Sequence, residues 1–393
     1  MENKFQSYNG YFAPNAGDLE AFKALITRTL DPASVPLAAS IESNVPIYDM
    51  VALDAALRDP EQLRSLMAEW AAVLRGSAGV IVLKSAYADT APIDRATEVF
   101  NAIIAGERVS GAGKGDHFAA SGANDRIWNS LQKHCLRDPE GFALYFGNAA
   151  IAAVAEAWLG PHYQMTAQVN LVRPGGKAQQ AHRDYHLGFQ NAEMAARYPA
   201  HAHALTATLT LQGAIAHCDM PVDSGPTKLL PFSQLYDLGY IAFHDADHRA
   251  AFEQSCIQLP LSKGDAVFFN PALFHAAGEN RSTNIARMVN LLQVSSAFGR
   301  AMEAIDRSAM VRALFPVVAE LEQAGKMDDA QIAALIAASA EGYPFPTNLD
   351  TDPPVGGNAP PSQADVMRRA LVDRKSPSEF NTDLAALSQR QTP

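Results

Sequence analysis

The sequence is poor in three features that would mark particular classes of protein. Only 3 of its 393 residues are cysteine, and they form no CxxC pair, which argues against a disulfide framework or a thiolate metal site. Lys and Arg number 31 against 42 Asp and Glu, so the formal net charge of −11 disfavours nucleic acid and anionic membranes as partners. No apolar run approaches the roughly 20 residues that a membrane span needs.

The overall amino-acid composition is typical of a folded protein with a large core. Hydrophobic residues make up 48% of the chain and charged residues 19%, which excludes disorder over most of its length. Residues 1–20 lack the basic segment followed by an apolar one that marks a secretory signal. We therefore expect a cytoplasmic protein with reduced cysteines.

Helical and strand patterns fall in different parts of the chain. Apolar residues at three- and four-residue spacing predict helices early in the chain and again after Ser296. Between them, short apolar runs divided by Gly- and Pro-rich turns predict strands, at an irregular spacing that favours a sandwich or barrel. The predicted helices are Leu19–Leu30, Pro60–Leu74, Pro92–Ile104, Ala149–Trp158, Arg300–Ala324, Asp328–Ser339, Gln363–Val372 and Glu379–Ser388, and the predicted strands are Ala78–Leu83, Tyr163–Val172, Leu205–Ala216, Gly264–Asn270 and Ile285–Ser295.

The spacing His-x-Asp occurs twice, as His182-x-Asp184 and as His217-x-Asp219. On a strand, residues i and i+2 face the same side, so an imidazole and a carboxylate can converge on one point. A second imidazole from a distant strand would complete three ligands on one face of an octahedron. That arrangement suits Fe(II) and leaves positions for a co-substrate and dioxygen. The spacing alone does not choose between the two pairs.

The wider context is an ordered set of motifs along Tyr163–Ser295: "AHRDYH", "DSGPTKLLPFSQ", "KGDAVFFNPALFHAAGENRS" and "ARMVNL". This order resembles the phytanoyl-CoA dioxygenase family of Fe(II)- and 2-oxoglutarate-dependent oxygenases. In that family an HxD motif comes first, a Gly-Pro turn follows, and a distal His and then an Arg lie beyond a Gly-Asp strand. The resemblance implies that His182, Asp184 and His275 bind iron and form the catalytic centre. His217-x-Asp219 stands too close to the Gly-Pro turn to leave room for the intervening strand.

Four further residues are candidates for binding 2-oxoglutarate. Arg287 lies in an apolar run, where a buried Arg costs several kcal/mol unless an anion meets it. The resemblance assigns it to the far carboxylate of 2-oxoglutarate. Gln168 and Asn170 alternate on one predicted strand face, where such amides either contact the co-substrate or hydrogen-bond across strands. Ser282, in the quoted "NRS" segment, is the fourth candidate.

We therefore expect a mainly β protein with flanking helices. Residues 1–300 are expected to form a double-stranded β-helix, a jelly-roll or cupin-like core, together with the N-terminal helices. Residues 301–393 are expected to form a helical C-terminal extension that packs on the barrel or joins the subunits of a homo-oligomer.

The resemblance implies an Fe(II)- and 2-oxoglutarate-dependent dioxygenase. With dioxygen it would hydroxylate or desaturate a small-molecule substrate, releasing succinate and CO2. Two alternatives stay open: a cupin-like metal enzyme of another class (an isomerase or hydrolase), and a non-catalytic protein that binds metal and 2-oxoglutarate. The residues that select the substrate are expected in Gly111–Arg126, His186–His203 and the C-terminal extension.

Overall fold

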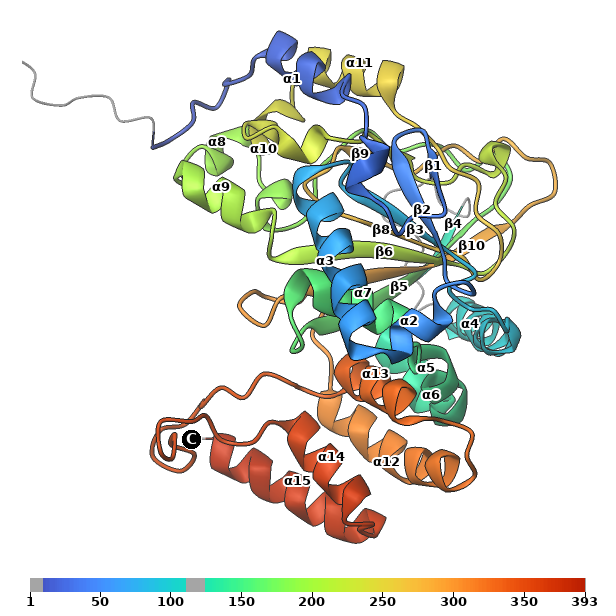
Figure 1. Ribbon diagram of the computed structural model, residues 1–393, viewed down its shortest axis with the longest axis vertical. Coiled ribbons are helices and arrows are strands. Elements are labelled where there is room, and N and C mark those ends of the chain that lie inside the picture. The colour runs from blue at the N-terminus through green and yellow to red at the C-terminus, as the bar shows by residue number, and fades with distance from the viewer. Residues whose placement is uncertain (1–9, 111–123, 393) are drawn as a thin grey trace, which may run out of the picture.

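The computed structural model describes residues 10–110 and 124–392, and its main layer is an eight-stranded sheet (Figure 1). The strand order is β1-β2-β3-β8-β6-β10-β5-β4. Of the pairs in it, β2 and β3 are parallel and the others are antiparallel. The strands are β1 (Ser40–Glu42), β2 (Val45–Asp49), β3 (Val80–Lys84), β4 (Asn124–Ile127), β5 (Gln164–Val172), β6 (Thr210–Ala216), β8 (Ala266–Phe269) and β10 (Arg287–Ser295).

The second layer is much smaller. It is the antiparallel ladder of β7 (Lys228–Leu229) and β9 (His275–Ala276). Isolated bridges extend it from His182 to His275 and from Leu229 to Ile257. The predicted combination of strands with flanking helices is confirmed, but the described residues contain more helix than a mainly β protein would.

The central strands of the sheet are buried on both faces, which is why β3 and β8 are almost continuously apolar. In β8, Ala266 and Phe268 pack in the large apolar cluster on the helix side, while Val267 and Phe269 pack in a smaller cluster on the opposite face. The same alternation in β10 sends Leu292 to the helix side and Val289 to the opposite face. Successive side chains along a strand therefore point to opposite faces of the sheet.

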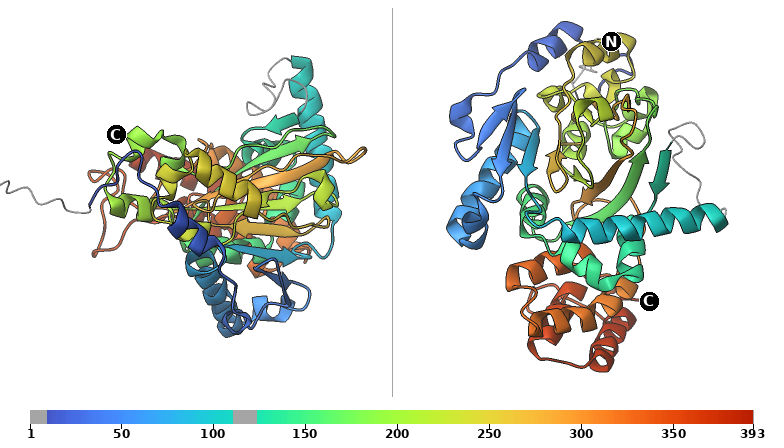
Figure 2. Two further views of the ribbon diagram at one scale, coloured as in Figure 1. Left: turned by 90° about the horizontal axis from the view of Figure 1, so that it is seen from above. Right: turned by 90° about the vertical axis from the view of Figure 1, so that its right-hand side faces the viewer.

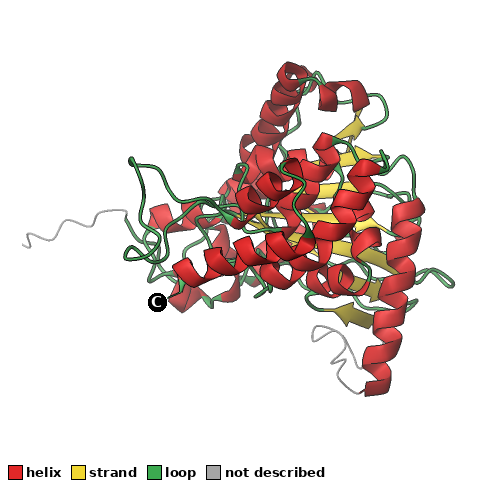
Figure 3. Cartoon of the chain, turned by 90° about the horizontal axis from the view of Figure 1, so that it is seen from below, coloured by secondary structure: helices red, strands yellow, loops and turns green. Residues whose placement is uncertain are grey.

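Helices from both ends of the chain cover one face of the sheet, and Figure 3 shows them in front of the strands. Their termini follow sequence signals: Asp59 accepts from the backbone N–H groups of Glu61 and Gln62, and Asn148 accepts from that of Ile151. The helices of the first 300 residues are α1 (Leu19–Ile26), α2 (Asp54–Arg58), α3 (Pro60–Gly76), α4 (Ala91–Ser110), α5 (Ser130–Arg137), α6 (Pro139–Phe146), α7 (Ala149–Leu159), α8 (Ala192–Ala195), α9 (Ala200–Thr206), α10 (Gly239–Ala242) and α11 (Ala246–Ser255).

Four helices follow the last strand and lie at the lower end of the molecule in Figure 1 and in the right view of Figure 2. Phe315 and Phe380 stack between two of them, with ring centroids 4.2 Å apart. Arg307 donates to the carbonyl of Met165 on β5 at 2.9 Å. The four helices therefore bury their apolar faces in the same cluster as α3–α7. They are α12 (Arg307–Gln323), α13 (Asp329–Ser339), α14 (Gln363–Val372) and α15 (Pro377–Gln391).

Several predicted boundaries were wrong, and the two largest errors at the start of an element are at Leu205 and Arg300. The strand predicted over Leu205–Ala216 begins only at Thr210. Leu205 and Thr206 form the end of α9, and Thr208 lies in the turn between α9 and β6. The Thr208 hydroxyl donates to the Leu205 carbonyl at 2.8 Å, a local bond that competes with strand pairing. The helix predicted from Arg300 begins at Arg307 and continues through Pro316.

No single helix in the described ranges is long and apolar enough to cross a membrane. The bent pair of α6 and α7, which meet at 63°, passes the length and composition test together. Their buried residues, including Phe142 and Val154, belong to the main apolar cluster.

Two buried histidines lie on the helix side of the sheet. The Nδ1 atom of His217 lies 2.8 Å from Thr97 Oγ1, and its Nε2 lies 2.8 Å from the Tyr145 hydroxyl. Because Thr97 donates its own proton to the Ile93 carbonyl, Nδ1 donates and Nε2 accepts, which fixes a neutral ring. Burial lowers the pKa of His217 to about 3 and that of His134 to about 4.

These pKa values predict a loss of stability in mild acid. Below pH 6.5 these two histidines bind protons in the unfolded chain but stay neutral in the folded protein. The free energy of unfolding therefore falls as the pH falls. The slope is at most about 1.4 kcal/mol per pH unit for each histidine. Urea unfolding between pH 7 and pH 5 should be less pH-dependent in His134→Leu than in wild type. Equal slopes would contradict the assignment, and exposed His201→Gln is the matched control.

Candidate metal centre

Backbone pairing brings the first HxD motif against the distal histidine. The His182 N–H donates to the His275 carbonyl at 3.0 Å, and the His275 N–H donates back to the His182 carbonyl at 3.1 Å. The N–H of Asp184 donates to the Pro271 carbonyl at 2.9 Å. The segment that carries His182 and Asp184 is extended but forms only this bridge and no regular strand.

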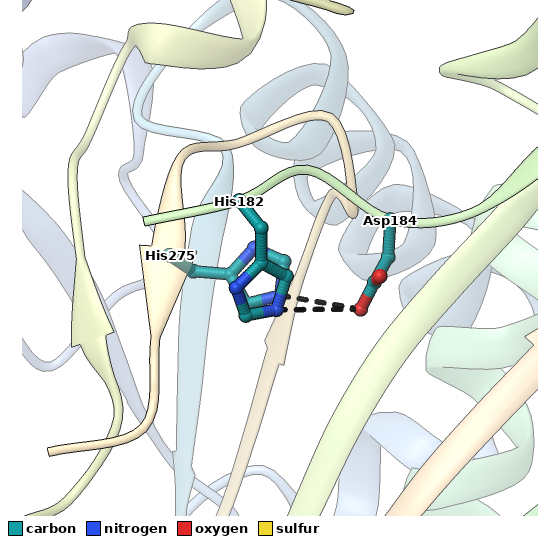
Figure 4. Close-up of side chains that lie close together, drawn as sticks. All are labelled: His182, Asp184 and His275. Atoms are coloured by element: carbon teal, nitrogen blue, oxygen red, sulfur yellow. Dashed lines mark ion pairs between the residues drawn. The ribbon is translucent and has the colours of Figure 1, made fainter. Parts of the chain in front are cut away.

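The three side chains converge, as Figure 4 shows. Asp184 Oδ2 lies 3.4 Å from His275 Nε2 and 3.8 Å from His182 Nε2. One ligand atom from each residue lies within 4.8 Å of the others, which is the spacing of donors around a single ion. Among residues 10–110 and 124–392, this is the only group of three or more His, Cys, Asp or Glu side chains that converges in this way.

The donor atoms fit a metal ion in their protonation as well as in their spacing. His182 Nδ1 donates to the Gln180 carbonyl at 2.9 Å, and His275 Nδ1 donates to the Leu273 carbonyl at 2.8 Å. With the proton held at Nδ1, each Nε2 presents a lone pair. Burial and the neighbouring His275 lower the pKa of His182, which favours the neutral ligand form.

Asp184 is held as an ionised acceptor. Burial alone would raise the pKa of its carboxyl group, but the neighbouring groups, including the hydrogen bond from Gln212, lower it overall. Gln212 on β6 donates from Nε2 to Asp184 Oδ2 at 2.8 Å. Two neutral imidazoles and one carboxylate form the donor set that suits Fe(II).

The three ligand residues line a cavity of about 640 Å³. Its wall on the side of the sheet comes mainly from β5, β6, β8 and β10. In each of these strands, mainly alternate residues face the cavity. Most of the wall is apolar, including Val267, Phe269 and Val289. Besides the three ligand residues, the polar residues on it are Arg126, Gln168, Asn170, Gln179, Gln180, Arg183, Tyr185, Gln212, Thr227, Arg287 and Gln293.

Arg287 is a buried cation in this cavity. Its side chain is 3% exposed, and its Nε has no hydrogen-bond partner in the described part of the chain. No Asp or Glu of the described residues forms an ion pair with it, whereas surface arginines such as Arg58 do. Burial lowers the pKa of Arg287 to about 10, so it stays charged at neutral pH. An uncompensated buried cation of this kind calls for an anionic ligand.

The other three candidates for co-substrate binding occupy different places. Gln168 and Asn170 line the cavity from β5, and Gln168 Oε1 accepts from Arg126 at 2.8 Å. Asn170 Oδ1 is buried and has no partner in the described ranges. Ser282 does not line the cavity. Its hydroxyl donates to Asn280 Oδ1 at 2.6 Å and stabilises the turn before β10.

The second HxD pair does not converge with a third ligand-type side chain from residues 10–110 and 124–392. The ring of His217 is bonded to Thr97 and Tyr145 on the helix side, away from the cavity. Asp219 is exposed and accepts from the Lys263 N–H at 2.9 Å. The choice of His182 and Asp184 over this pair therefore agrees with the geometry.

Two residues next to the ligands were not predicted from the sequence. Tyr185 directly follows Asp184, and Gln212 is the one long polar side chain in the strand-forming run from Thr210 to Ala216. A lone polar residue in an apolar run was a usable signal for Gln212. For Tyr185 no signal separated a buried aromatic residue from one that presents its hydroxyl to a ligand. Trp128 of the cavity wall, whose ring centroid lies 4.9 Å from the Arg126 guanidinium carbon, was also missed.

The fold and the site define a protein with a candidate metal centre of two histidines and one carboxylate in a cavity lined by the sheet. The chain belongs to the phytanoyl-CoA dioxygenase (PhyH) family, whose model matches residues 53–289. That region contains His182, Asp184, His275 and Arg287 and more than half of the chain. The family predicted from the ordered motifs is confirmed.

Among curated proteins, the dioxygenase trt7 of Aspergillus terreus (strain NIH 2624 / FGSC A1156) is 28% identical over 139 residues. The match covers 35% of this chain and 43% of that relative, so this chain matches less than half of the relative's length.

Similar solved structures include the non-heme alpha-ketoglutarate-dependent epimerase SnoN of nogalamycin biosynthesis, at 20% identity and a TM-score of 0.39, covering 61% of this chain and 84% of that one. HygX from Streptomyces hygroscopicus, solved with nickel and 2-oxoglutarate bound, has 12% identity and a TM-score of 0.39 and covers 63% and 91%.

Proposed function

We propose that this protein is an Fe(II)- and 2-oxoglutarate-dependent dioxygenase that hydroxylates or desaturates a small molecule and releases succinate and CO2. One observation carries the proposal. The metal-ligand set lines the same cavity as Arg287, a buried cation with no ion-pair partner among the described residues, so that cavity offers sites for a metal ion and for a carboxylate. An isomerase or hydrolase centred on Zn or Mn would need the second of these sites only for a substrate that itself carries a carboxylate.

His182, Asp184 and His275 would hold the iron, and when bound the iron supplies the activation of dioxygen coupled to decarboxylation of 2-oxoglutarate. Arg287 binds the far carboxylate of 2-oxoglutarate through charge-assisted hydrogen bonds. Gln168 and Asn170 present amide groups to the same cavity and orient the co-substrate. The apolar wall excludes water from the reacting atoms.

We also propose that the eight-stranded sheet and the β7–β9 ladder are the two layers of a distorted double-stranded β-helix. The bridges at His182, Leu229 and Met220 support this arrangement, because they continue the small layer on either side of the ladder. The ligands then come from the small layer, and Arg287 comes from the large sheet. A separate role for residues 301–393 in joining subunits remains a prediction.

The side chains expected to choose the substrate lie in part at the mouth of the cavity. Within 186–203, Phe189 lines the cavity and is 57% exposed. From the range predicted upstream, Arg126 lines it too, while 111–123 lie outside the described residues. The proposal is tested by dioxygen consumption, which should require both Fe(II) and 2-oxoglutarate. Turnover of a substrate without oxygen or 2-oxoglutarate would indicate another class of metal enzyme.

The carboxylate of Asp184 predicts which products form. Halogenating relatives of this chemistry make room for chloride by replacing the ligand carboxylate with a small residue, and here the carboxylate is present. We expect a hydroxylated or desaturated product and no chlorinated one, even in high chloride. Mass spectrometry of the product formed under labelled dioxygen decides this. One heavy oxygen gained or two hydrogens lost agrees, and a chlorine isotope pattern contradicts the role given to Asp184.

A further inference from the structure

Gln212 links the metal ligand Asp184 to its neighbour Tyr185. Its Nε2 atom lies 2.8 Å from Asp184 Oδ2 and 2.8 Å from the Tyr185 hydroxyl oxygen. Gln212 lies on β6 opposite Phe269 of β8, and both Gln212 and Tyr185 line the cavity of the metal centre. The three side chains therefore form one hydrogen-bonded unit beside the ligand set.

The orientation of the Gln212 amide follows from the chemistry of its neighbour. A carboxylate only accepts hydrogen bonds, so the atom that faces Asp184 must be the amide nitrogen. A carboxylate oxygen has a second lone pair, so Asp184 can accept from Gln212 and still ligate a metal ion. Both N–H groups of Gln212 are then occupied, one by Asp184 and one by the oxygen of Tyr185.

This arrangement leaves one donor and one acceptor without partners. The Tyr185 oxygen accepts from Gln212, and its own proton has no acceptor among the residues that the structure describes. Gln212 Oε1 is buried and likewise has no donor in the described ranges. Tyr185 is 1% exposed, and a buried polar group without a partner costs about 1–3 kcal/mol. Both side chains line the cavity and share a hydrogen bond, so a small side-chain shift that uncovers Gln212 Oε1 lets one ligand oxygen contact both groups.

We propose that Tyr185 and Gln212 together bind a hydroxyl group of the substrate, next to the carbon that is oxidised. A hydroxyl is the simplest group that satisfies both partners, because it accepts from Tyr185 and donates to Gln212. A ketone would leave Gln212 Oε1 without a donor. With the largely apolar wall around them, the substrate class is a mostly hydrocarbon alcohol. This inference rests on the proposed function, since it takes the oxidised carbon to lie beside the metal.

The test uses the full-length protein loaded with Ni(II) and 2-oxoglutarate, and two probes of similar shape, cyclohexanol and methylcyclohexane. Affinities are measured by ligand-observed NMR for wild type, Tyr185→Phe and, as the matched control, Tyr48→Phe. Tyr48 is a buried tyrosine outside the cavity whose hydroxyl donates to Glu69. We expect Tyr185→Phe to weaken cyclohexanol binding by roughly tenfold and to leave methylcyclohexane binding unchanged.

A crystal of the loaded protein soaked in cyclohexanol should place the hydroxyl oxygen about 2.6–3.2 Å from both Tyr185 Oη and Gln212 Oε1. Three results would overturn the inference: no binding of cyclohexanol to wild type, an equal effect of Tyr185→Phe on both probes, or a fall in 2-oxoglutarate affinity in Tyr185→Phe. Calorimetric binding of Ni(II) and 2-oxoglutarate to wild type is measured first. If wild type does not bind Ni(II) and 2-oxoglutarate, the proposed function is refuted. If it binds both, but cyclohexanol binds equally well to wild type and Tyr185→Phe, only the role of Tyr185 is refuted.

Discussion

Replacing His182 by alanine is expected to abolish iron binding and iron-dependent turnover while the protein still folds. The ring supplies one of three converging donors, and its removal leaves a site with two. The core does not depend on the ion, because the His182 side chain is 30% exposed and the sheet and helices are held together by apolar contacts elsewhere. Iron retained after gel filtration and the far-ultraviolet circular dichroism spectrum measure the two effects. Asp184→Ala and His275→Ala should likewise lose turnover.

The matched control for this variant is His186→Asn. His186 lies four residues further along the same segment, is partly buried and does not line the cavity. Its backbone φ is 49°, a left-handed conformation that asparagine tolerates better than alanine does. Iron content should be unchanged in this control. Iron retained by His182→Ala and lost from a His217 variant would show that the other HxD pair holds the metal.

Truncating Arg287 to alanine is expected to weaken 2-oxoglutarate binding by about 30-fold to several-thousand-fold. Charge-assisted contacts to a carboxylate in a dry site are worth about 2–5 kcal/mol when one partner is removed, at roughly 1.4 kcal/mol per tenfold change. Arg287→Lys should lose part of this affinity, because an ammonium cannot make the two-pronged contact of a guanidinium. Calorimetric titration of 2-oxoglutarate into the metal-loaded protein measures both variants.

Arg281→Ala provides the control for this effect. It removes an equal charge from the turn before β10, but Arg281 is exposed and does not line the cavity. Its affinity for 2-oxoglutarate should match that of wild type. If Arg287→Ala binds 2-oxoglutarate as tightly as Arg281→Ala, another cation, such as Arg126, holds the carboxylate.

The sequence predicted the ligand set because each part has a local signature. His182 and Asp184 share an HxD spacing, His275 follows a strand rich in aromatic residues, and Arg287 is a cation at the head of an apolar run. A charged side chain on a strand that is otherwise apolar must face something specific. In the structure it lines a cavity with no carboxylate partner from the described residues.

What the sequence did not predict depends on tertiary contacts. The residues around His182 look like a strand but form a single β-bridge, to His275, since the small layer of the fold is largely irregular. Thr206 and Thr208 alternate like strand residues, yet side-chain hydrogen bonding and α9 take them out of the sheet. The pairing of Gln212 with Tyr185 joins β6 to a segment 27 residues earlier, and no local pattern encodes that contact.

The measurement that tests the central claim most directly is the isotopic composition of succinate formed from 2-oxoglutarate under labelled dioxygen. It needs no knowledge of the substrate, because slow decarboxylation without substrate is enough for mass spectrometry. If Fe(II) at His182, Asp184 and His275 couples dioxygen to decarboxylation, wild type forms succinate with one heavy oxygen atom, and His182→Ala forms none. Wild-type protein that binds Fe(II) and 2-oxoglutarate but forms no labelled succinate would contradict this account and identify a binding protein instead.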